Sequence, residues 1–278
     1  MSGDTPARLQ ASGVGVSLGG RVIVSDATLS LKAGEFTVMV GPNGAGKTTL
    51  MRALAGLARC SGEVRLDGHP LAAMKARERA RRLAYLPQGH VFHWPLDVAT
   101  LVELGREPHA DPFTPLSAAD HDAVAHAMAA TGVTGFADRA ITTLSGGEQA
   151  RVAIARALAT QADVLLADEP IGSLDARHQL IVLNLLRRIA RDGAAVLAII
   201  HDLTLAARFA DHIAIIADGR IVVHDTPERA LEPARIAEIF GVTVERFETA
   251  DGPVLIPSHA LGEDVSRSAP PTPGAAPP

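Results

Sequence analysis

The sequence predicts an α/β fold with three parts: an N-terminal antiparallel β-subdomain, a parallel-sheet core and a helical subdomain. The first observation behind this prediction is a glycine-rich loop at residues 41–48, which follows an apolar strand at 36–40 and leads into a helix. The second is the region from Leu144 onward, where predicted helices alternate with fully apolar strands, as in a parallel sheet covered on both faces. The third is residues 89–143, where helical patterns flank a proline-rich stretch.

The first third of the chain is predicted to be rich in strands. We expect strands at 9–16, 27–31, 36–40, 62–66 and 83–86, with turn signals at Gly19-Gly20, Ala33-Gly34 and Asp67-Gly68. A helix at 49–55 ends at Gly56, a residue typical of a helix C-terminus. The helical subdomain, about 89–143, has predicted helices at 98–104 and 118–130, and Ser117 with Asp120 resembles a capping box for the second.

In the last part of the chain, predicted helices and strands alternate regularly. We expect helices at 148–159, 176–191 and 203–209, and strands at 164–167 and 195–200. A hairpin is predicted at 213–217 and 220–223 around Asp218-Gly219, and Thr226-Pro227 indicates the start of another helix. Residues 262–278, rich in Pro, Ala and Ser, predict a disordered tail after a domain at 1–261.

Composition narrows the function. The 278 residues are 47% hydrophobic, enough for a large core, and a formal net charge of −5 argues against nucleic-acid binding, which needs a basic surface. The single cysteine, Cys60, excludes an internal disulfide and fits a reducing compartment. No apolar run approaches the ~18 residues of a membrane span. We therefore expect a soluble chain that acts at a membrane only through a partner.

The loop at 41–48 predicts a phosphate site. It reads Gly-Pro-Asn-Gly-Ala-Gly-Lys-Thr, and its glycines allow backbone N–H groups to face phosphate oxygens at a helix N-terminus. Lys47 supplies a positive charge for the β- and γ-phosphates, and the Thr48 hydroxyl can bind Mg²⁺. The alternative is a chance Gly-Lys-Thr in an ordinary turn. The chain has only three lysines, and the loop has both the strand and the helix it needs, so the phosphate site is favoured.

Two carboxylates at a strand end form the second chemical landmark. Asp168 and Glu169 follow the apolar strand at 164–167, where Asp168 can hold Mg²⁺ and Glu169 can polarise an attacking water. His201 follows the strand at 195–200. Since ligands collect at the carboxyl ends of parallel strands, we expect all three near the γ-phosphate.

A second anion-binding loop reads Leu144-Ser145-Gly146-Gly147-Glu148-Gln149 and leads into a helix. Gly146 and Gly147 would expose N–H groups, and Ser145 adds a hydroxyl. The chain thus has two predicted phosphate loops but only one hydrolytic carboxylate pair. This is explained if two chains form a dimer in which the two loops, one from each chain, contact different faces of the same nucleotide.

The loop at 144–149 is similar to the signature loop of the ATP-binding cassette (ABC) family, and the chain resembles this family from about residue 9 to residue 256. The resemblance implies a P-loop ATPase cassette. Gln88 is similar to the Q-loop glutamine, residues 173–175 to the D-loop and His201 to the switch histidine. The implied cofactors are ATP and Mg²⁺, in a reaction that converts ATP and water to ADP and phosphate. The implied partner is a second cassette, arranged head to tail.

The resemblance assigns residues to three roles. The catalytic residues are Glu169, His201 and Gln88, and the metal ligands are Thr48, Gln88 and Asp168. The nucleotide-binding residues are Gly41, Pro42, Asn43, Gly44, Ala45, Gly46, Lys47, Thr48, Thr49, Ser145, Gly146, Gly147 and Asp175. Where the family usually has an aromatic residue against adenine, this chain has Leu18, so aliphatic contact would replace stacking.

Two classes of function remain open. One is the energising subunit of a bacterial importer, and the other is a soluble, non-transport ATPase of the same superfamily that acts in DNA repair or translation. Repair members need a long coiled coil and translation members usually carry two cassettes, and neither feature is present, which favours transport.

Residues 94–98 and 103–109 are similar to the helical region of cassettes that serve importers of iron chelates, haem and cobalamin. We expect a ferric siderophore or haem as cargo, with cobalamin as the alternative. The implied assembly is a homodimer of cassettes under a polytopic permease dimer, at the cytoplasmic face of the bacterial inner membrane. A periplasmic binding protein would act indirectly, and no nucleic acid is expected.

Two further patterns leave alternatives open. Lys75, Arg77, Arg79, Arg81 and Arg82 predict either a solvated helix face or a docking or phosphate-binding face. Among the 11 histidines, His90 and His93 beside Trp94 fit no compelling metal-ligand spacing, so a solvated or partner-contacting loop is favoured there.

Overall fold

The computed structural model describes residues 6–89, 94–111, 113–172, 174–250 and 252–261. The predicted tail at 262–278 and the histidines His90 and His93 lie outside these residues. The N-terminal β-subdomain is a four-stranded antiparallel sheet in the order β2-β1-β4-β5. Its strands are β1 (Ala7–Leu18), β2 (Arg21–Lys32), β4 (Ser61–Leu66) and β5 (His69–Pro70). The turn at Gly19-Gly20 joins β1 to β2 as predicted, although β2 begins six residues earlier than expected.

The second sheet is the parallel core. It has six strands in the order β10-β9-β3-β8-β7-β6, and each neighbouring pair is parallel except β9 and β10. The strands are β3 (Phe36–Val40), β6 (Leu83–Leu86), β7 (Val164–Ala167), β8 (Ala195–Ile199), β9 (His212–Ala217) and β10 (Arg220–Asp225). The fold class and the hairpin of β9 and β10 are therefore confirmed. Since the parallel strands share one direction, their carboxyl ends meet at one edge.

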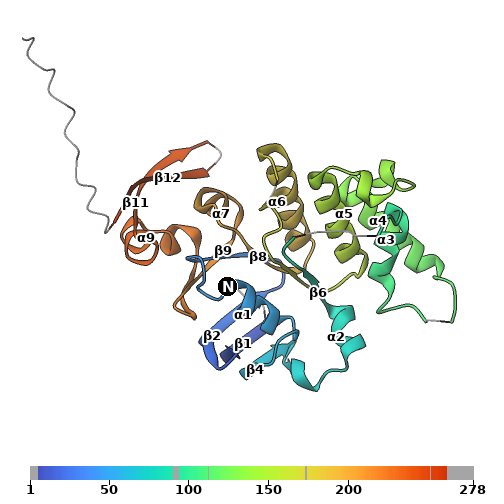
Figure 1. Cartoon of the computed structure of the whole chain (residues 1–278), viewed down its shortest axis with the longest axis horizontal. Helices are drawn as coiled ribbons and strands as arrows, with labels where there is room; N and C mark the ends of the chain where they lie inside the picture. The colour runs from blue at the N-terminus through green and yellow to red at the C-terminus, as the bar shows by residue number, and fades with distance from the viewer. Residues whose placement is uncertain (1–5, 90–93, 112, 173, 251, 262–278) are drawn as a thin grey trace, which may run out of the picture.

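Helix α1 (Lys47–Leu54) lies between the two sheets (Figure 1). Its Leu50 and Leu54 share a core with Leu9 of β1 and with Met39 and Leu166 of the second sheet. Alternate residues of the same strands, such as Val38 and Leu165, face a second core on the other side. The helices with buried residues in that core are α5 (Gly146–Ala159), α6 (Ala176–Arg191), α7 (Leu203–Phe209), α8 (Pro227–Ala230) and α9 (Pro233–Phe240). The position of α1 brings the glycine loop directly above the sheet edge.

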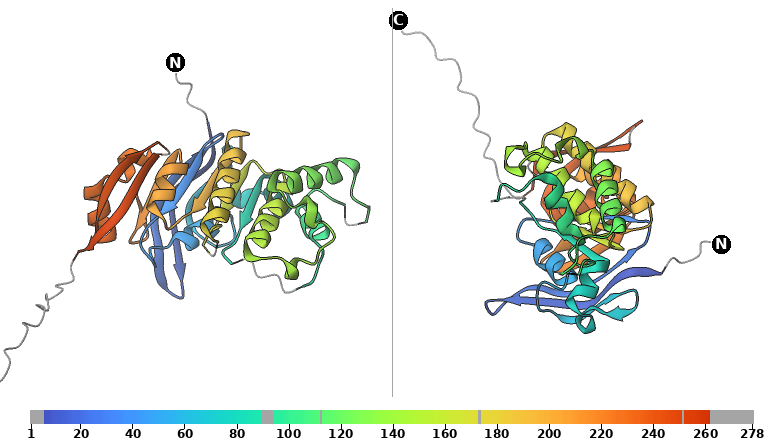
Figure 2. Two further views of the ribbon diagram at one scale, coloured as in Figure 1. Left: turned by 90° about the horizontal axis from the view of Figure 1, so that it is seen from above. Right: turned by 90° about the vertical axis from the view of Figure 1, so that its right-hand side faces the viewer.

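The helical part stands at one end of the molecule, as Figure 2 shows. Helices α3 (Val98–Glu103) and α4 (Ala118–Thr131) share a third core with one face of α5, while the other face of α5 joins the second core. The short 3₁₀ helices are η1 (Leu71–Ala73), η2 (Leu104–Arg106), η3 (Thr134–Phe136) and η4 (Ile141–Thr143). Within the described residues, no helix combines the length and apolar character that a membrane span requires.

Three elements near the C-terminus were not predicted. They are α9 and a separate two-stranded sheet of β11 (Val242–Thr249) and β12 (Gly252–Ala260), which lies at the end opposite the helical part (Figures 1 and 2). Both strands are mostly exposed or half-buried, so they lack the strong apolar alternation that marks a covered strand. The Asp251-Gly252 pair was the signal that could have indicated the hairpin.

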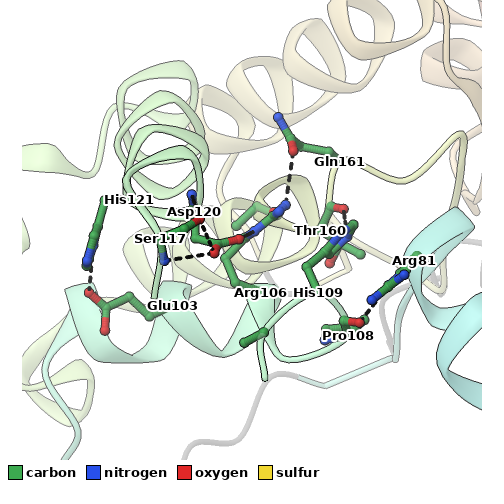
Figure 3. Close-up of polar contacts among 12 residues, drawn as sticks. Arg81, Glu103, Arg106, Pro108, His109, Ser117, Asp120, His121, Thr160 and Gln161 are labelled. Atoms are coloured by element: carbon green, nitrogen blue, oxygen red, sulfur yellow. Dashed lines mark hydrogen bonds and ion pairs between the residues drawn. The ribbon is translucent and has the colours of Figure 1, made fainter. Parts of the chain in front are cut away.

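Helix α2 (Ala76–Arg82) carries the basic cluster, and three of its arginines bind other segments of the chain. The Nε atoms of Arg77 and Arg81 donate to the Pro108 carbonyl at 2.9 and 2.8 Å, the latter drawn in Figure 3. Arg82 forms ion pairs with Asp67 and Asp163. Arg77 and Arg81 are exposed, so the helix is solvated, and it also docks against the helical part.

A buried arginine joins two helices of the helical part. Arg106 is only 5% exposed, and its Nε donates to Asp120 Oδ1 at 2.8 Å at the start of α4 (Figure 3). Its Nη1 donates to the Ala159 carbonyl and to Gln161 Oε1 at the end of α5. Asp120 also completes the predicted capping box with the Ser117 hydroxyl, at 2.6 Å. The capping box is thus confirmed, whereas its arginine partner could not be predicted from the sequence.

This network predicts an acid-sensitive contribution to stability. Hydrogen bonds from Ser117 and Arg106 lower the pKa of Asp120 to about 2. An unfolded Asp titrates near ~3.9, so the stabilisation is complete above about pH 4 and is lost as the pH falls towards about 2. We expect the melting-temperature difference between wild type and Asp120→Asn to shrink over that range. The exposed Asp122→Asn serves as control, and a difference independent of pH would contradict the prediction.

Candidate functional site

The glycine loop is held close to the second sheet. A Cβ atom on Gly41 would lie 2.1 Å from the carbonyl oxygen of Ile216 on β9, a distance that no side chain tolerates. Glycine at this position therefore lets the loop leave β3 and turn over the sheet edge towards α1. Lys47 then begins α1, two residues before the predicted start of the helix at residue 49.

The Lys47 ammonium lies inside the loop. Its Nζ donates to the carbonyls of Gly41 and Pro42 at 2.8 and 2.9 Å, and the residue is 7% exposed. Burial lowers the pKa of Lys47, and the nearby Glu169 and Asp168 carboxylates partly offset this effect. The loop therefore presents a largely desolvated cation beside two acidic side chains.

Asp168 is fully buried at the end of β7 and accepts two hydroxyl groups. Thr48 Oγ1 donates to its Oδ1 at 3.2 Å, and the Tyr85 hydroxyl donates to its Oδ2 at 3.3 Å. Burial raises the pKa of Asp168, while the two hydrogen bonds act in the opposite direction. Burial, followed by the Asp168 charge, raises the pKa of Tyr85 to about 12, so its hydroxyl remains a donor near neutral pH.

Sequence reasoning missed Tyr85. It lies on β6, where it is opposite Leu166 in the parallel register with β7. A signal was present, because Tyr85 comes three residues before Gln88 on a strand that ends at the site. Only the neighbouring position of β6 and β7 shows that this tyrosine reaches Asp168.

Glu169 receives two side chains that are distant in sequence. Gln88 Nε2 donates to Glu169 Oε2 at 2.7 Å, and His201 Nε2 lies 2.7 Å from Oε1. The three residues follow β6, β7 and β8, three adjacent parallel strands. Glu169 has a left-handed backbone with φ 50°, which a non-glycine residue adopts at an energetic cost. Strain and two hydrogen bonds thus accompany the carboxylate that the sequence assigns to catalysis.

These elements border a cavity of about 330 Å³. Its lining residues are Ile23, Asn43, Gly44, Gly46, Lys47, Thr48, Thr49, Glu169 and His201. Leu18 is not among them and is 54% exposed at the end of β1, whereas Ile23 of β2 is a lining residue that the sequence did not indicate. Three residues of the loop at 41–48 do not line the cavity either and instead shape the backbone of the loop: Gly41, Pro42 and Ala45.

Oxygen atoms at the cavity and directly beside it suit a hard divalent cation. Thr48 lines the cavity, whereas Asp168 and Gln88 are outside its lining and are bonded to the lining residues Thr48 and Glu169. The Thr48 hydroxyl, the Asp168 carboxylate and the side-chain oxygen of Gln88 are the donor types that Mg²⁺ prefers, and Mg²⁺ usually takes its remaining ligands from water and phosphate. Across the part of the chain that the structure describes, no group of three or more His, Cys, Asp or Glu side chains forms a metal site. The donor set therefore fits Mg²⁺ in company with a phosphate better than a metal held by protein alone.

The signature loop lies outside this cavity. Ser145 caps α5 and forms a capping box with Glu148, donating its hydroxyl to Oε2 at 2.9 Å. Gly146 is exposed, whereas Gly147 is buried. Asp175 caps α6 by accepting the His178 N–H at 2.9 Å. The chain thus brings together the glycine loop, Asp168, Glu169, Gln88 and His201, and it leaves the signature loop and Asp175 at a second place.

Comparison with known proteins gives consistent matches. The family model described as ABC transporter matches residues 24–172. The hemin import ATP-binding protein HmuV of Streptomyces coelicolor is 44% identical over 253 residues, covering 90% of this chain and 89% of that protein. HmuV of Myxococcus xanthus is 42% identical, and the match covers 90% of this chain and 96% of that protein. The cobalamin import ATP-binding protein BtuD of Halobacterium salinarum is also 42% identical, and the match covers 85% of this chain and 59% of that protein.

Solved structures show the same fold. An inward-facing ABC transporter of the metal-chelate type has a chain that matches with a TM-score of 0.79 at 22% identity, covering 91% of this chain and 98% of that one. A dimeric bacterial ABC transporter cassette matches with a TM-score of 0.69 at 27% identity, covering 79% of this chain and 98% of that one.

The close approach at Gly41 predicts a specific sensitivity. Gly41→Ala places a methyl group against the Ile216 backbone, so we expect the melting temperature to fall by about 5 °C or more. Gly135→Ala is the matched control, because its added methyl group would meet open space. Equal melting temperatures for the two variants would show that the loop adjusts freely.

Proposed function

This chain belongs to the ABC transporter family and is an ATPase of that family, and we propose that it energises a bacterial importer of haem or another iron chelate. The observation that carries the cargo is its 44% identity to a hemin import ATP-binding protein over nearly the full length of both chains. The cavity between Lys47 and Glu169 supports the chemistry.

ATP would bind with its phosphates in the glycine loop. The backbone N–H groups of residues 41–46 and the N-terminus of α1, including Thr49, provide hydrogen bonds and a favourable dipole for the phosphates. Lys47, now bonded to two loop carbonyls, is within the same loop and would exchange these partners for β- and γ-phosphate oxygens. Ile23, which lines the cavity, would give adenine an aliphatic contact, and Leu18, outside the lining at the exposed end of β1, is the second side chain that we assign to adenine.

Thr48, Asp168 and Gln88 would hold Mg²⁺ through their oxygen atoms. When bound there, Mg²⁺ offsets the negative charge that develops on the phosphate oxygens. Thr48 is bonded to Asp168, so the hydroxyl and the carboxylate face the same place. Tyr85 keeps the second oxygen of Asp168 oriented.

Glu169 would polarise the attacking water. Its carboxylate is only 19% exposed, and His201 and Gln88 each hold one of its oxygen atoms. Because each carboxylate oxygen has a second lone pair, the group can still accept a hydrogen bond from water. His201 holds Glu169 in place through Nε2, and this N–H would exchange Glu169 for a γ-phosphate oxygen when ATP is bound.

A head-to-tail dimer would complete the site. Ser145, Gly146, Gly147 and Asp175 do not line the cavity of their own chain. In the dimer they would face the ATP of the opposite cassette, with Ser145 and the N-terminus of α5 directed at its phosphates. The 27% identical cassette that forms a dimer supports the pairing of two cassettes.

The membrane partner would be a polytopic permease dimer at the cytoplasmic face of the inner membrane. Trp94, which is 76% exposed, and Leu96 follow Gln88 closely in the chain, and exposed apolar side chains of this kind suit a protein interface. A periplasmic binding protein would deliver the cargo. We assign residues 1–261 to one ATPase domain and about 89–143 to its helical subdomain.

The reaction step is tested by Glu169→Gln, which keeps the shape of the side chain and removes its charge. We expect ATP binding to persist while hydrolysis falls at least about 100-fold. Phosphate release and nucleotide binding are measured on the same preparation, with the exposed Glu228→Gln as control. Hydrolysis near the wild-type rate in Glu169→Gln would refute the role of Glu169.

The cargo is tested by uptake in cells whose own copy carries Lys47→Ala. We expect loss of haem or ferric siderophore uptake and normal cobalamin uptake, because the variant cannot hold the ATP phosphates. Cells that also receive the wild-type chain are the control. Loss of cobalamin uptake alone would replace the iron assignment with the cobalamin alternative, and normal uptake of all three would exclude import.

A further inference from the structure

His178 connects the two loops that lie outside the cavity. It is in the first turn of α6, and its Nδ1 lies 2.9 Å from both carboxylate oxygens of Asp175, the N-cap of that helix. Hydrogen bonds from the backbone N–H and the ring of His178 lower the pKa of Asp175. The Asp175 side chain is 67% exposed, whereas that of His178 is only 21% exposed. The carboxylate is therefore held from its inner side by the imidazole.

The same imidazole covers Gly147 of the signature loop. A Cβ atom on Gly147 would lie 2.7 Å from Cγ and 2.8 Å from Cδ2 of His178, closer than real side chains approach. Nothing lies within 4 Å of the corresponding position on Gly146. The ring thus fills the space next to one glycine of the loop and leaves the other open.

We propose that His178 is a positioning residue that holds Asp175 and the signature loop of its own chain as one unit. This inference rests on the proposed function, in which both groups act on the ATP of the opposite cassette. Asp175 and Gly147 come from different helix N-termini, 28 residues apart in the sequence. The ring touches both, so it fixes the spacing with which they approach the second cassette. Misplacement of such groups slows catalysis without affecting the nucleotide site of the same chain.

The steric part of the proposal is tested by a double-mutant cycle on thermal stability. Gly147 is in the first turn of α5 and its φ is not left-handed, so alanine suits its backbone and has the better helix propensity. In the wild-type chain, Gly147→Ala should lower the melting temperature because its methyl group meets the ring. In the His178→Ala background, the same change should be neutral or stabilising. An equal loss in both backgrounds would refute the contact.

The positioning part is tested by ATP hydrolysis. His178→Ala should lower kcat about tenfold while ATP binding to the isolated subunit stays at the wild-type level. His178→Asn keeps a side-chain amide that can donate to Asp175, so it should recover part of the lost rate, whereas His178→Phe keeps only the ring contact and should recover less. His126→Ala, which removes an exposed histidine on α4, is the matched control.

The outcomes separate this proposal from the function on which it rests. If His178→Ala hydrolyses ATP like His126→Ala, the positioning role is wrong even when Lys47→Ala is inactive. If Phe restores the rate as well as Asn does, the bond to Asp175 is irrelevant and the proposal fails in that respect. Wild-type hydrolysis by Lys47→Ala would instead refute the proposed ATP site.

Discussion

The buried Asp168 carboxylate is the interaction on which the site depends. It directly follows the apolar strand β7, and two hydroxyl groups from different elements bond to it and offset the cost of its burial. Thr48 comes from α1, which lies between the two sheets, and Tyr85 comes from the neighbouring strand β6. The carboxylate therefore fixes the glycine loop relative to the parallel sheet. In the proposed function, this carboxylate is also one of the Mg²⁺ ligands.

The parallel sheet explains why the remaining groups converge. Gln88, Glu169 and His201 are separated by 81 and 32 residues along the chain, yet they follow three adjacent strands that run in the same direction. Each of these strands delivers one of the three side chains at its carboxyl end, and β7 also delivers Asp168. The left-handed backbone of Glu169 adds the turn that directs this carboxylate towards both neighbours.

Helix α5 differs from the other helices described above because its buried residues contribute to two cores. One face packs with β6, β7 and α6, and the other packs with α3 and α4. Its N-terminus carries the signature loop. At its C-terminus, the Ala159 carbonyl accepts a hydrogen bond from the buried Arg106 of the helical part. Helix α5 therefore links the helical part to the loop that His178 covers.

The sequence by itself determined the local features of this protein. The glycine loop, the apolar strands, the carboxylate pair and the capping box at Ser117 depend on residues close together in the chain, and the elements at 164–167, 176–191 and 203–209 were predicted to the residue. Only the tertiary structure decided which distant side chains meet, including Tyr85 with Asp168, Arg106 with Asp120 and His178 with Gly147. The reason is that periodicity shows which face of an element is buried but not what covers it. The exposed hairpin of β11 and β12 escaped prediction for the related reason that weak burial leaves a weak pattern.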